Sequence, residues 1–211
     1  MDDINLKPGE VTVAYFLRHG QTADNAKGFY KPENAELDKK GLAQSHAAKK
    51  FFDDKELGQA YTDDSKRTRQ TADIVLGGRK HPIEIDQRLG HFNVGDAAGK
   101  PKKDFAEIAK KVRQDKNTKF PGSDESLNDF DGRVRKPLLK ALRVGLESGK
   151  PSFITTHDSV LHSLGRILHN NSKSALVHPG GVVRVVWDGK NRQFKSQAVF
   201  GSKDSNDKEV S

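Results

Sequence analysis

Short apolar runs alternate with longer amphipathic stretches along this sequence, and that alternation limits its fold more than any other feature. Residues 11–17 form a nearly continuous apolar run, which is typical of a buried strand. Asp38 can cap a helix that extends to about Phe52. Similar patterns predict strands at 59–62, 83–85, 152–156, 182–187 and 194–199, and helices at 65–76, from the break at 121–123 to about 146, and at 159–168. Strands that alternate with helices predict an α/β sheet with helices on both faces.

Several positions should interrupt or end these elements. Pro137 is expected to kink or interrupt its helix, because proline lacks the backbone N–H that a helix interior uses. Residues 188–191 predict a hairpin turn between the last two strands, and the Lys-rich stretch 100–120 predicts a surface helix and loop. The last eleven residues, 201–211, are polar and are expected to be a disordered tail.

Length and composition fit one folded domain, expected over residues 1–200. The chain has 211 residues, and a hydrophobic fraction of 33% with 11 Phe suffices for one core of this size. No apolar run approaches the roughly 20 residues of a membrane-spanning helix. The absence of Cys excludes disulfides, thiolate metal sites and a Cys nucleophile. The first residues also lack the basic and apolar regions of a signal peptide, so we expect a cytoplasmic protein.

The net charge of +8 predicts an anionic partner. Lys and Arg are scattered among Asp and Glu along the chain, with no basic cluster interleaved with aromatic residues. This distribution argues against nucleic acid and favours a phosphorylated small molecule.

The strongest chemical signal lies directly after the first predicted strand, where Arg18, His19 and Gly20 are followed by Gln21, Thr22 and Asn25. Open α/β sheets bind ligands at the carboxyl ends of their strands. Arginine offers paired donors to phosphate oxygens, a neutral imidazole nitrogen can act as a nucleophile, and glycine permits close backbone approach. A strand-end pair without chemistry is the alternative interpretation.

Two further polar groups follow predicted strands. Residues 67–72 read Arg-Thr-Arg-Gln-Thr-Ala, and residues 157–159 read His-Asp-Ser. Together with Arg18-His19-Gly20 and the segment 121–126, Pro-Gly-Ser-Asp-Glu-Ser, they resemble the histidine phosphatase superfamily, which includes cofactor-dependent phosphoglycerate mutases and many small phosphatases. The resemblance spans residues 11–187. It implies a phosphoglycerate mutase-like three-layer sandwich with a mostly parallel, mixed sheet, and small cap segments near 21–36 and 92–125.

The resemblance also implies the roles of individual residues. His19 would attack phosphorus and become phosphohistidine, while the phosphate oxygens would be held by Arg18, Arg67 and His157. Asn25, Thr22, Gln21 and His178 are candidates for further ligand contacts. Arg69 is the alternative to Arg67, and His157 could instead be a buried structural histidine.

The sequence departs from the family at the proton donor. The family usually carries a Glu shortly after the leucine that corresponds to Leu89. The register places His91 at the position of that Glu, and Ala97-Ala98 replace the usual aromatic–acid pair. Three explanations stay open. His91 could be the donor, since histidine titrates near neutrality. Asp158 could be the donor, as in a second branch of the superfamily, although it could equally cap the following helix. The third explanation is that no donor exists and turnover is weak.

These patterns lead to a leading hypothesis and two alternatives. Only residues 100–124 separate the stretch that ends at Gly99, where the family usually carries its acid, from the helix start at Glu125-Ser126. The cap over the site is therefore expected to be short, and water should reach a phosphohistidine. We therefore expect a phosphomonoesterase, with no cofactor and no metal because no metal-ligand motif occurs. A catalytically weak phosphate-binding or regulatory protein and a mutase-type phosphotransferase are the alternatives. A homodimer is compatible with the sequence.

Overall fold

A computed structural model describes residues 6–30, 32, 34–77, 82–169 and 176–202 and contains one six-stranded sheet in the order β3-β2-β4-β1-β5-β6. The strands β3, β2, β4 and β1 are parallel, whereas β5 runs antiparallel to β1, and β6 runs antiparallel to β5. Their bounds are β1 Glu10–Arg18, β2 Ala60–Thr62, β3 Ile83–Ile85, β4 Ser152–Thr156, β5 Val177–Asp188 and β6 Gln193–Ser202. The predicted mixed, mostly parallel sheet is confirmed.

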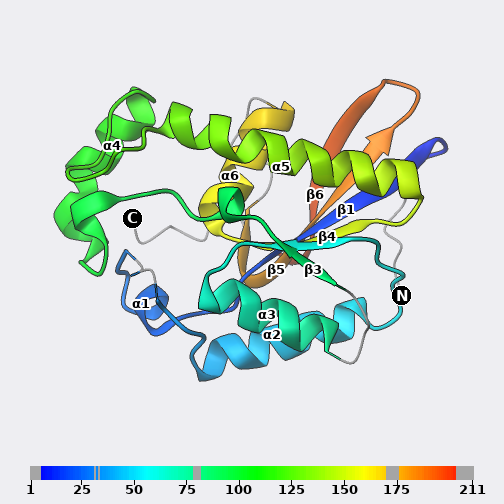
Figure 1. Ribbon diagram of the computed structural model, residues 1–211, viewed down its shortest axis with the longest axis horizontal. Helices are drawn as coiled ribbons and strands as arrows, with labels where there is room; N and C mark the ends of the chain where they lie inside the picture. The colour runs from blue at the N-terminus through cyan, green and yellow to red at the C-terminus, as the bar shows by residue number, and fades with distance from the viewer. Residues whose placement is uncertain (1–5, 31, 33, 78–81, 170–175, 203–211) are drawn as a thin grey trace.

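Helices cover both faces of this sheet (Figure 1). One face carries α2 (Lys39–Phe52) and α3 (Lys66–Leu76), and the other carries α5 (Leu127–Ser148) and α6 (Asp158–His169). The remaining elements are shorter: α1 Ala23–Ala26, α4 Ala106–Gln114 and the 3-10 turns η1 Gln87–Leu89, η2 Gly95–Ala97 and η3 Lys102–Phe105. Because β1 is buried on both faces, it reads as a continuous apolar run rather than an alternating one.

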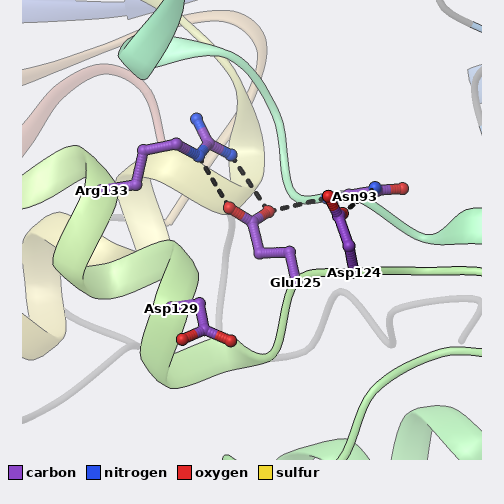
Figure 2. A pocket seen from close by; sticks show the side chains of 5 residues that line it. All are labelled: Asn93, Asp124, Glu125, Asp129 and Arg133. Atoms are coloured by element: carbon purple, nitrogen blue, oxygen red, sulfur yellow. Dashed lines mark hydrogen bonds and ion pairs between the residues drawn. The ribbon is translucent and has the colours of Figure 1, made fainter.

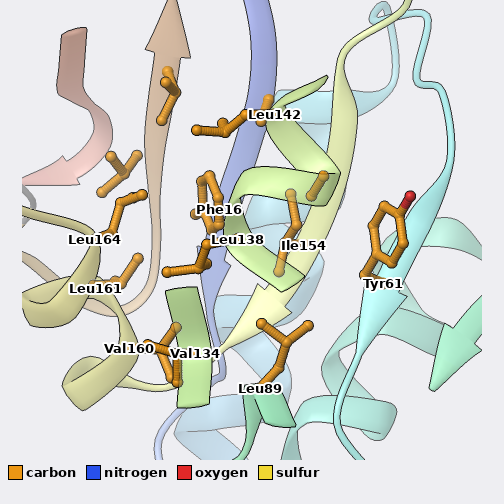
Figure 3. Packing of buried hydrophobic residues seen from close by; sticks show 14 of the residues in the cluster. Phe16, Tyr61, Leu89, Val134, Leu138, Leu142, Ile154, Val160, Leu161 and Leu164 are labelled. Carbon is orange, nitrogen blue, oxygen red and sulfur yellow. The ribbon is translucent and has the colours of Figure 1, made fainter. Parts of the chain in front are cut away.

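Two hydrophobic clusters hold the layers together. Phe16 of β1 packs with Leu138 and Leu142 of α5 on one face (Figure 3). Tyr15 and Leu17, which point the other way, pack with residues of α2 and α3. A third cluster lies away from the sheet and joins the two predicted cap segments; it contains Val94, Ala97, Val112 and Phe120, with Tyr30 and Phe105 packed against it.

Several predicted boundaries need correction. Helix α5 is continuous from Leu127 to Ser148 although Pro137 lies inside it. Pro137 is itself buried, so packing against the core compensates for the hydrogen bond that it cannot donate. Strand β5 begins at Val177, earlier than predicted, because it continues across register shifts between Val177 and Val183.

The edge strand also extends further than the sequence predicted. Gly201 and Ser202 were expected in a disordered tail but belong to β6, where Ser202 pairs with Val177. The rest of that expected tail, 203–211, lies outside the described residues. Within the described part of the chain, no helix has the length and apolar character needed to cross a membrane.

Candidate active site

Three neighbouring strands each end at a polar side chain on the same edge of the sheet. Asp63 follows β2, His157 follows β4 and His19 follows β1. These strands are adjacent in the order β2-β4-β1, and Arg18 is opposite Thr156 in the register. The parallel arrangement therefore brings together residues that are far apart in the sequence.

His19 is fully buried, and its hydrogen bonds define which ring nitrogen can react. Its Nδ1 lies 2.7 Å from the Gly20 carbonyl oxygen. A carbonyl only accepts hydrogen bonds, so Nδ1 carries the proton and Nε2 carries the lone pair. The backbone is held as well, since the His19 N–H donates to the Thr156 carbonyl at 2.9 Å. Nε2 is thus the ring nitrogen whose chemistry would allow nucleophilic attack.

Arg18, the residue before His19 in the sequence, is buried and retains an unused donor. Its Nη1 is 2.8 Å from the Val177 carbonyl oxygen and 2.6 Å from Oδ1 of Asp158. Its Nε is buried with no hydrogen-bond partner among the described residues. A buried guanidinium donor of this kind is suited to an oxyanion.

The structure distinguishes Arg67 from Arg69. Arg67 on α3 is fully buried, and its Nη2 lies 3.5 Å from Nδ1 of His157, whereas Arg69 is exposed. The rings of His19 and His157 are 5.3 Å apart, centre to centre. Arg67 and His19, which come from two different segments of the chain, therefore both lie against His157.

Asp63 is the site residue that the sequence patterns missed. Its side chain is 1% exposed, and Oδ2 lies 2.9 Å from Nε2 of His157. Thr68 donates to Oδ1 at 2.6 Å, and Ser65 donates to Oδ2. Burial acts to raise the pKa of Asp63, but the charge of His157 and three side-chain hydrogen bonds outweigh it and hold this pKa well below its usual range. Its position directly after a strand was the one available signal.

The two candidate proton donors occupy different environments. The His91 ring stands 5.5 Å from the His157 ring, and its Nδ1 is 2.9 Å from the Phe92 carbonyl oxygen. Asp158 is the first residue of α6, and its carboxylate pairs with Arg18 and lies 3.5 Å from Nε2 of His162. Asp158 is therefore bound to Arg18, one of the arginines expected to hold phosphate.

Arg133 fixes the turn that carries His91. It donates to the backbone carbonyls of Arg88, Gly90 and His91 at 2.8 to 3.2 Å. It also forms a two-pronged ion pair with Glu125 (Figure 2). A cavity of about 480 Å³ beside this pair is lined by Asn93, Asp124, Glu125, Asp129 and Arg133.

The remaining predicted ligand residues make local contacts. Thr22 and Asn25 form a reciprocal capping box at the start of α1. The Gln21 side chain donates to Asp38 at 3.0 Å. It therefore links residues 19–22, the signature loop that follows β1, to the start of α2. His178 is exposed near the start of β5, next to Val177, whose carbonyl accepts from Arg18.

The glycine of the signature serves backbone packing against α2. A Cβ on Gly20 would lie 2.4 Å from the Gly41 carbonyl oxygen, and a Cβ on Gly41 would lie 2.1 Å from that of Gln21. The close approach predicted for Gly20 is thus to the backbone of α2. Separately, the described residues contain no group of three His, Cys, Asp or Glu side chains able to hold a metal ion.

Fold and site together define an α/β protein that gathers buried histidine and arginine side chains at the carboxyl ends of its parallel strands, an arrangement suited to an oxyanion. The family model of the histidine phosphatase superfamily (branch 1) matches residues 14–199, and the chain belongs to this family. Family membership was predicted from the sequence and is confirmed.

Relatives include both mutases and phosphatases. A 2,3-bisphosphoglycerate-dependent phosphoglycerate mutase of Thermoplasma acidophilum is 28% identical over 111 residues, covering 49% of this chain and 56% of that protein. The fructose-2,6-bisphosphatase TIGAR of Xenopus tropicalis is 26% identical over 137 residues, covering 62% of this chain and 50% of that protein. The chain thus spans about half the length of the curated relatives it matches.

Solved structures share the fold over nearly the whole chain. YhfR of Bacillus stearothermophilus has a TM-score of 0.74 at 25% identity, covering 92% of this chain and 98% of that one. A phosphoglycerate mutase of Bacillus anthracis has a TM-score of 0.77 at 19% identity, covering 92% of this chain and 94% of that one. The phosphoglycerate mutase-like fold predicted from the sequence is confirmed.

Proposed function

We propose that this protein is a metal-independent phosphomonoesterase that transfers a phosphoryl group to Nε2 of His19 and then to water. The observation that carries the proposal is the orientation of His19. Nδ1 is committed to the Gly20 carbonyl at 2.7 Å, which places the lone pair on Nε2, and the His19 ring lies 5.3 Å from the ring of His157, which in turn contacts Arg67. Phosphoryl transfer depends mainly on positioning and on stabilising negative charge, and this arrangement supplies both.

The reaction would proceed in two balanced steps. In the first, Nε2 of His19 bonds to phosphorus, the P–O bond to the alcohol breaks, and the leaving oxygen takes a proton from a general acid. In the second, water bonds to phosphorus, the N–P bond breaks, and the same residue takes a proton from the water. Inorganic phosphate leaves, and His19 returns to its starting state.

We assign the general acid to His91. Asp158 sits 2.6 Å from the Arg18 guanidinium, and this contact favours the ionised carboxylate, which has no proton to give. His91 has Nδ1 on the Phe92 carbonyl, so Nε2 is the nitrogen that gains and loses the proton. Its ring adjoins that of His157. General acid catalysis contributes typically about 10²- to 10⁴-fold.

Hydrolysis is favoured over transfer to a second substrate by the small cap. The cap segments near 21–36 and 92–125 meet through a short bridge between Phe29 and Pro101 and through the hydrogen bond from the Tyr30 N–H to the Lys100 carbonyl. A short cap admits water to the phosphohistidine. The substrate is a small phosphorylated metabolite, and the family setting of phosphatases and mutases supports that class.

The test compares two leaving groups. p-Nitrophenyl phosphate leaves as a stable phenolate and needs little protonation, whereas an alkyl phosphate needs a proton donor. We expect the wild-type protein to hydrolyse both, His19→Ala neither, and His91→Ala to lose about 10²-fold or more on the alkyl phosphate alone. Asp158→Asn should instead weaken both reactions, since it releases Arg18. Activity that survives in His19→Ala would refute the phosphohistidine mechanism.

A second candidate is a phosphate-binding or regulatory protein of the same fold. The observation that favours it is the His91 and Ala97-Ala98 block, which lacks the family's usual acid. Calorimetry that detects binding of a phosphorylated ligand by a wild-type protein without turnover would support this alternative. Full turnover of an alkyl phosphate would exclude it.

A further inference from the structure

We propose that Asp63 is a positioning residue that keeps His157 as a cationic imidazolium, aimed with its Nδ1–H at the phosphoryl oxygens. The inference deepens the proposed phosphatase function and rests on it. Asp63 does not reach the reacting atoms itself. It would act through His157, which lies between Asp63 and the nucleophile His19.

The geometry of the carboxylate supports one orientation of His157. Oδ2 of Asp63 is 2.9 Å from Nε2 of His157, and an ionised carboxylate only accepts, so Nε2 carries a proton. Nδ1 is then the nitrogen on the Arg67 side of the ring, and Nη2 of Arg67, which can only donate, lies 3.5 Å from it, at the outer limit of a hydrogen bond. Ser65 and Thr68 donate to the two carboxylate oxygens and prevent them from rotating.

The charges around His157 oppose one another. Arg67 on α3 faces its Nδ1 and disfavours a second proton, as does a protonated His91, whose ring lies 5.5 Å from that of His157; the His19 ring lies 5.3 Å away. Asp63 is the carboxylate in direct contact, while Asp158 at the start of α6 is paired with Arg18. Asp63 is also closer to His157 than Arg67 is, and in a buried setting the nearer opposite charge dominates.

The negative charge of Asp63 affects how strongly His157 can bind phosphoryl oxygens. Without Asp63, a cationic His157 would lie against Arg67 and against His91, which carries a proton when it acts as the general acid, and unlike Arg67 it can lose its charge. With Asp63, His157 can contribute a full positive charge and a hydrogen-bond donor to the transition state. A buried carboxylate left without its partner would be costly, which also explains why Asp63 is so fully hydrogen-bonded.

The experiment combines a spectroscopic and a kinetic measurement on the full-length protein. Long-range ¹H–¹⁵N spectra, assigned with a His157→Gln variant, report whether His157 carries one proton or two. We expect two in the wild type at pH 7.5. Asp63→Asn keeps an acceptor for Nε2–H but removes the charge, and should lower the midpoint of the His157 titration by about one to three pH units.

Asp64→Asn is the matched control. It removes the same charge from the next residue, which is exposed and accepts a hydrogen bond from Gln87. The titration of His157 should be unchanged in this variant. In kinetics with p-nitrophenyl phosphate at alkaline pH, Asp63→Asn should lose about tenfold in kcat/KM for each pH unit by which the His157 midpoint falls, with a smaller loss at pH 5.5. A purely structural role would lower activity equally at both pH values.

Each outcome decides the proposal. A wild-type His157 with a single proton at pH 7.5, or an unchanged titration in Asp63→Asn, overturns it. If Asp63→Asn does not fold, the wild-type spectrum still decides. A wild type that hydrolyses no phosphate ester would refute the proposed function, but it would leave the spectroscopic test of Asp63 intact.

Discussion

The contact between the signature loop and α2 leads to a prediction about stability and catalysis together. In Gly41→Ala, the new Cβ would lie 2.1 Å from the Gln21 carbonyl oxygen and 2.8 Å from its nitrogen, whereas ordinary contacts begin near 3.4 Å. Both partners are backbone atoms, so no side chain can rotate away, and the loop or the helix must retreat by roughly 1 Å. That movement is transmitted to His19, two residues from Gln21.

The magnitudes follow from this displacement. Overpacking costs about 1–3 kcal/mol, and the better helix propensity of alanine returns at most about 1 kcal/mol. We therefore expect a net loss of roughly 1–2 kcal/mol in the free energy of unfolding. A shift of about 1 Å in a reacting group can reduce activity by about 10²-fold. Urea unfolding and kcat/KM for p-nitrophenyl phosphate measure the two effects.

Gly132→Ala supplies the control within the same protein. Gly132 is exposed on α5, and a Cβ there would have no neighbour within 4 Å. This substitution should stabilise the protein by about 0.5–1 kcal/mol and leave activity unchanged. Wild-type stability and activity in Gly41→Ala, or equal losses in both variants, would refute the reasoning.

Three further predictions follow from the site and the helix ends. The pKa of Asp63 is depressed in the folded protein, so its contribution to stability is present above the unfolded pKa of about 3.9 and is lost as the pH falls below that value. In urea unfolding between pH 2.5 and 6, the free energy of unfolding of Asp63→Asn should therefore change less with pH than that of the wild type. Ser126→Ala removes the capping box at the start of α5 and should cost about 1 kcal/mol, and an unchanged melting curve would contradict that role. Dialysis against EDTA should leave phosphatase activity unchanged while vanadate inhibits it, and activity that returns only with added metal would argue against direct attack by His19.

Local sequence patterns predicted most of the helices and strands, because the spacing of hydrophobic residues in each segment matches the structure that the segment adopts. The expected strands at 83–85 and 152–156 coincide with β3 and β4. The start of β5 was missed because its His-Pro-Gly-Gly stretch has low strand propensity, and register shifts carry the strand past it. Pro137 was expected to break a helix that tertiary packing keeps intact.

The burial and grouping of the candidate site residues could be predicted where a motif identified them, but not where the order of strands in the sheet brought them together. The Arg67–Gln70–Thr71 register separated Arg67 from Arg69, and the structure buries the former and exposes the latter. No local pattern separates Asp63 from Asp64. Only the placement of β2 beside β4 brings Asp63 against His157, and that neighbour relation joins residues 94 positions apart.

Because β1 lies in the middle of the sheet but near the start of the sequence, it is synthesised before both of the strands that pair with it. Its two neighbours in the sheet, β4 and β5, begin at Ser152 and Val177, so the signature segment emerges from the ribosome long before either strand exists. At about 5–20 residues per second, the delay between His19 and Val177 is roughly ten to thirty seconds. During that time the apolar strand β1 and the adjoining His19 have neither of their neighbouring strands to pair with. Until its last third is made, the nascent chain can bury β1 only against helices that are already synthesised, such as α2, whose residues pack on Tyr15 and Leu17.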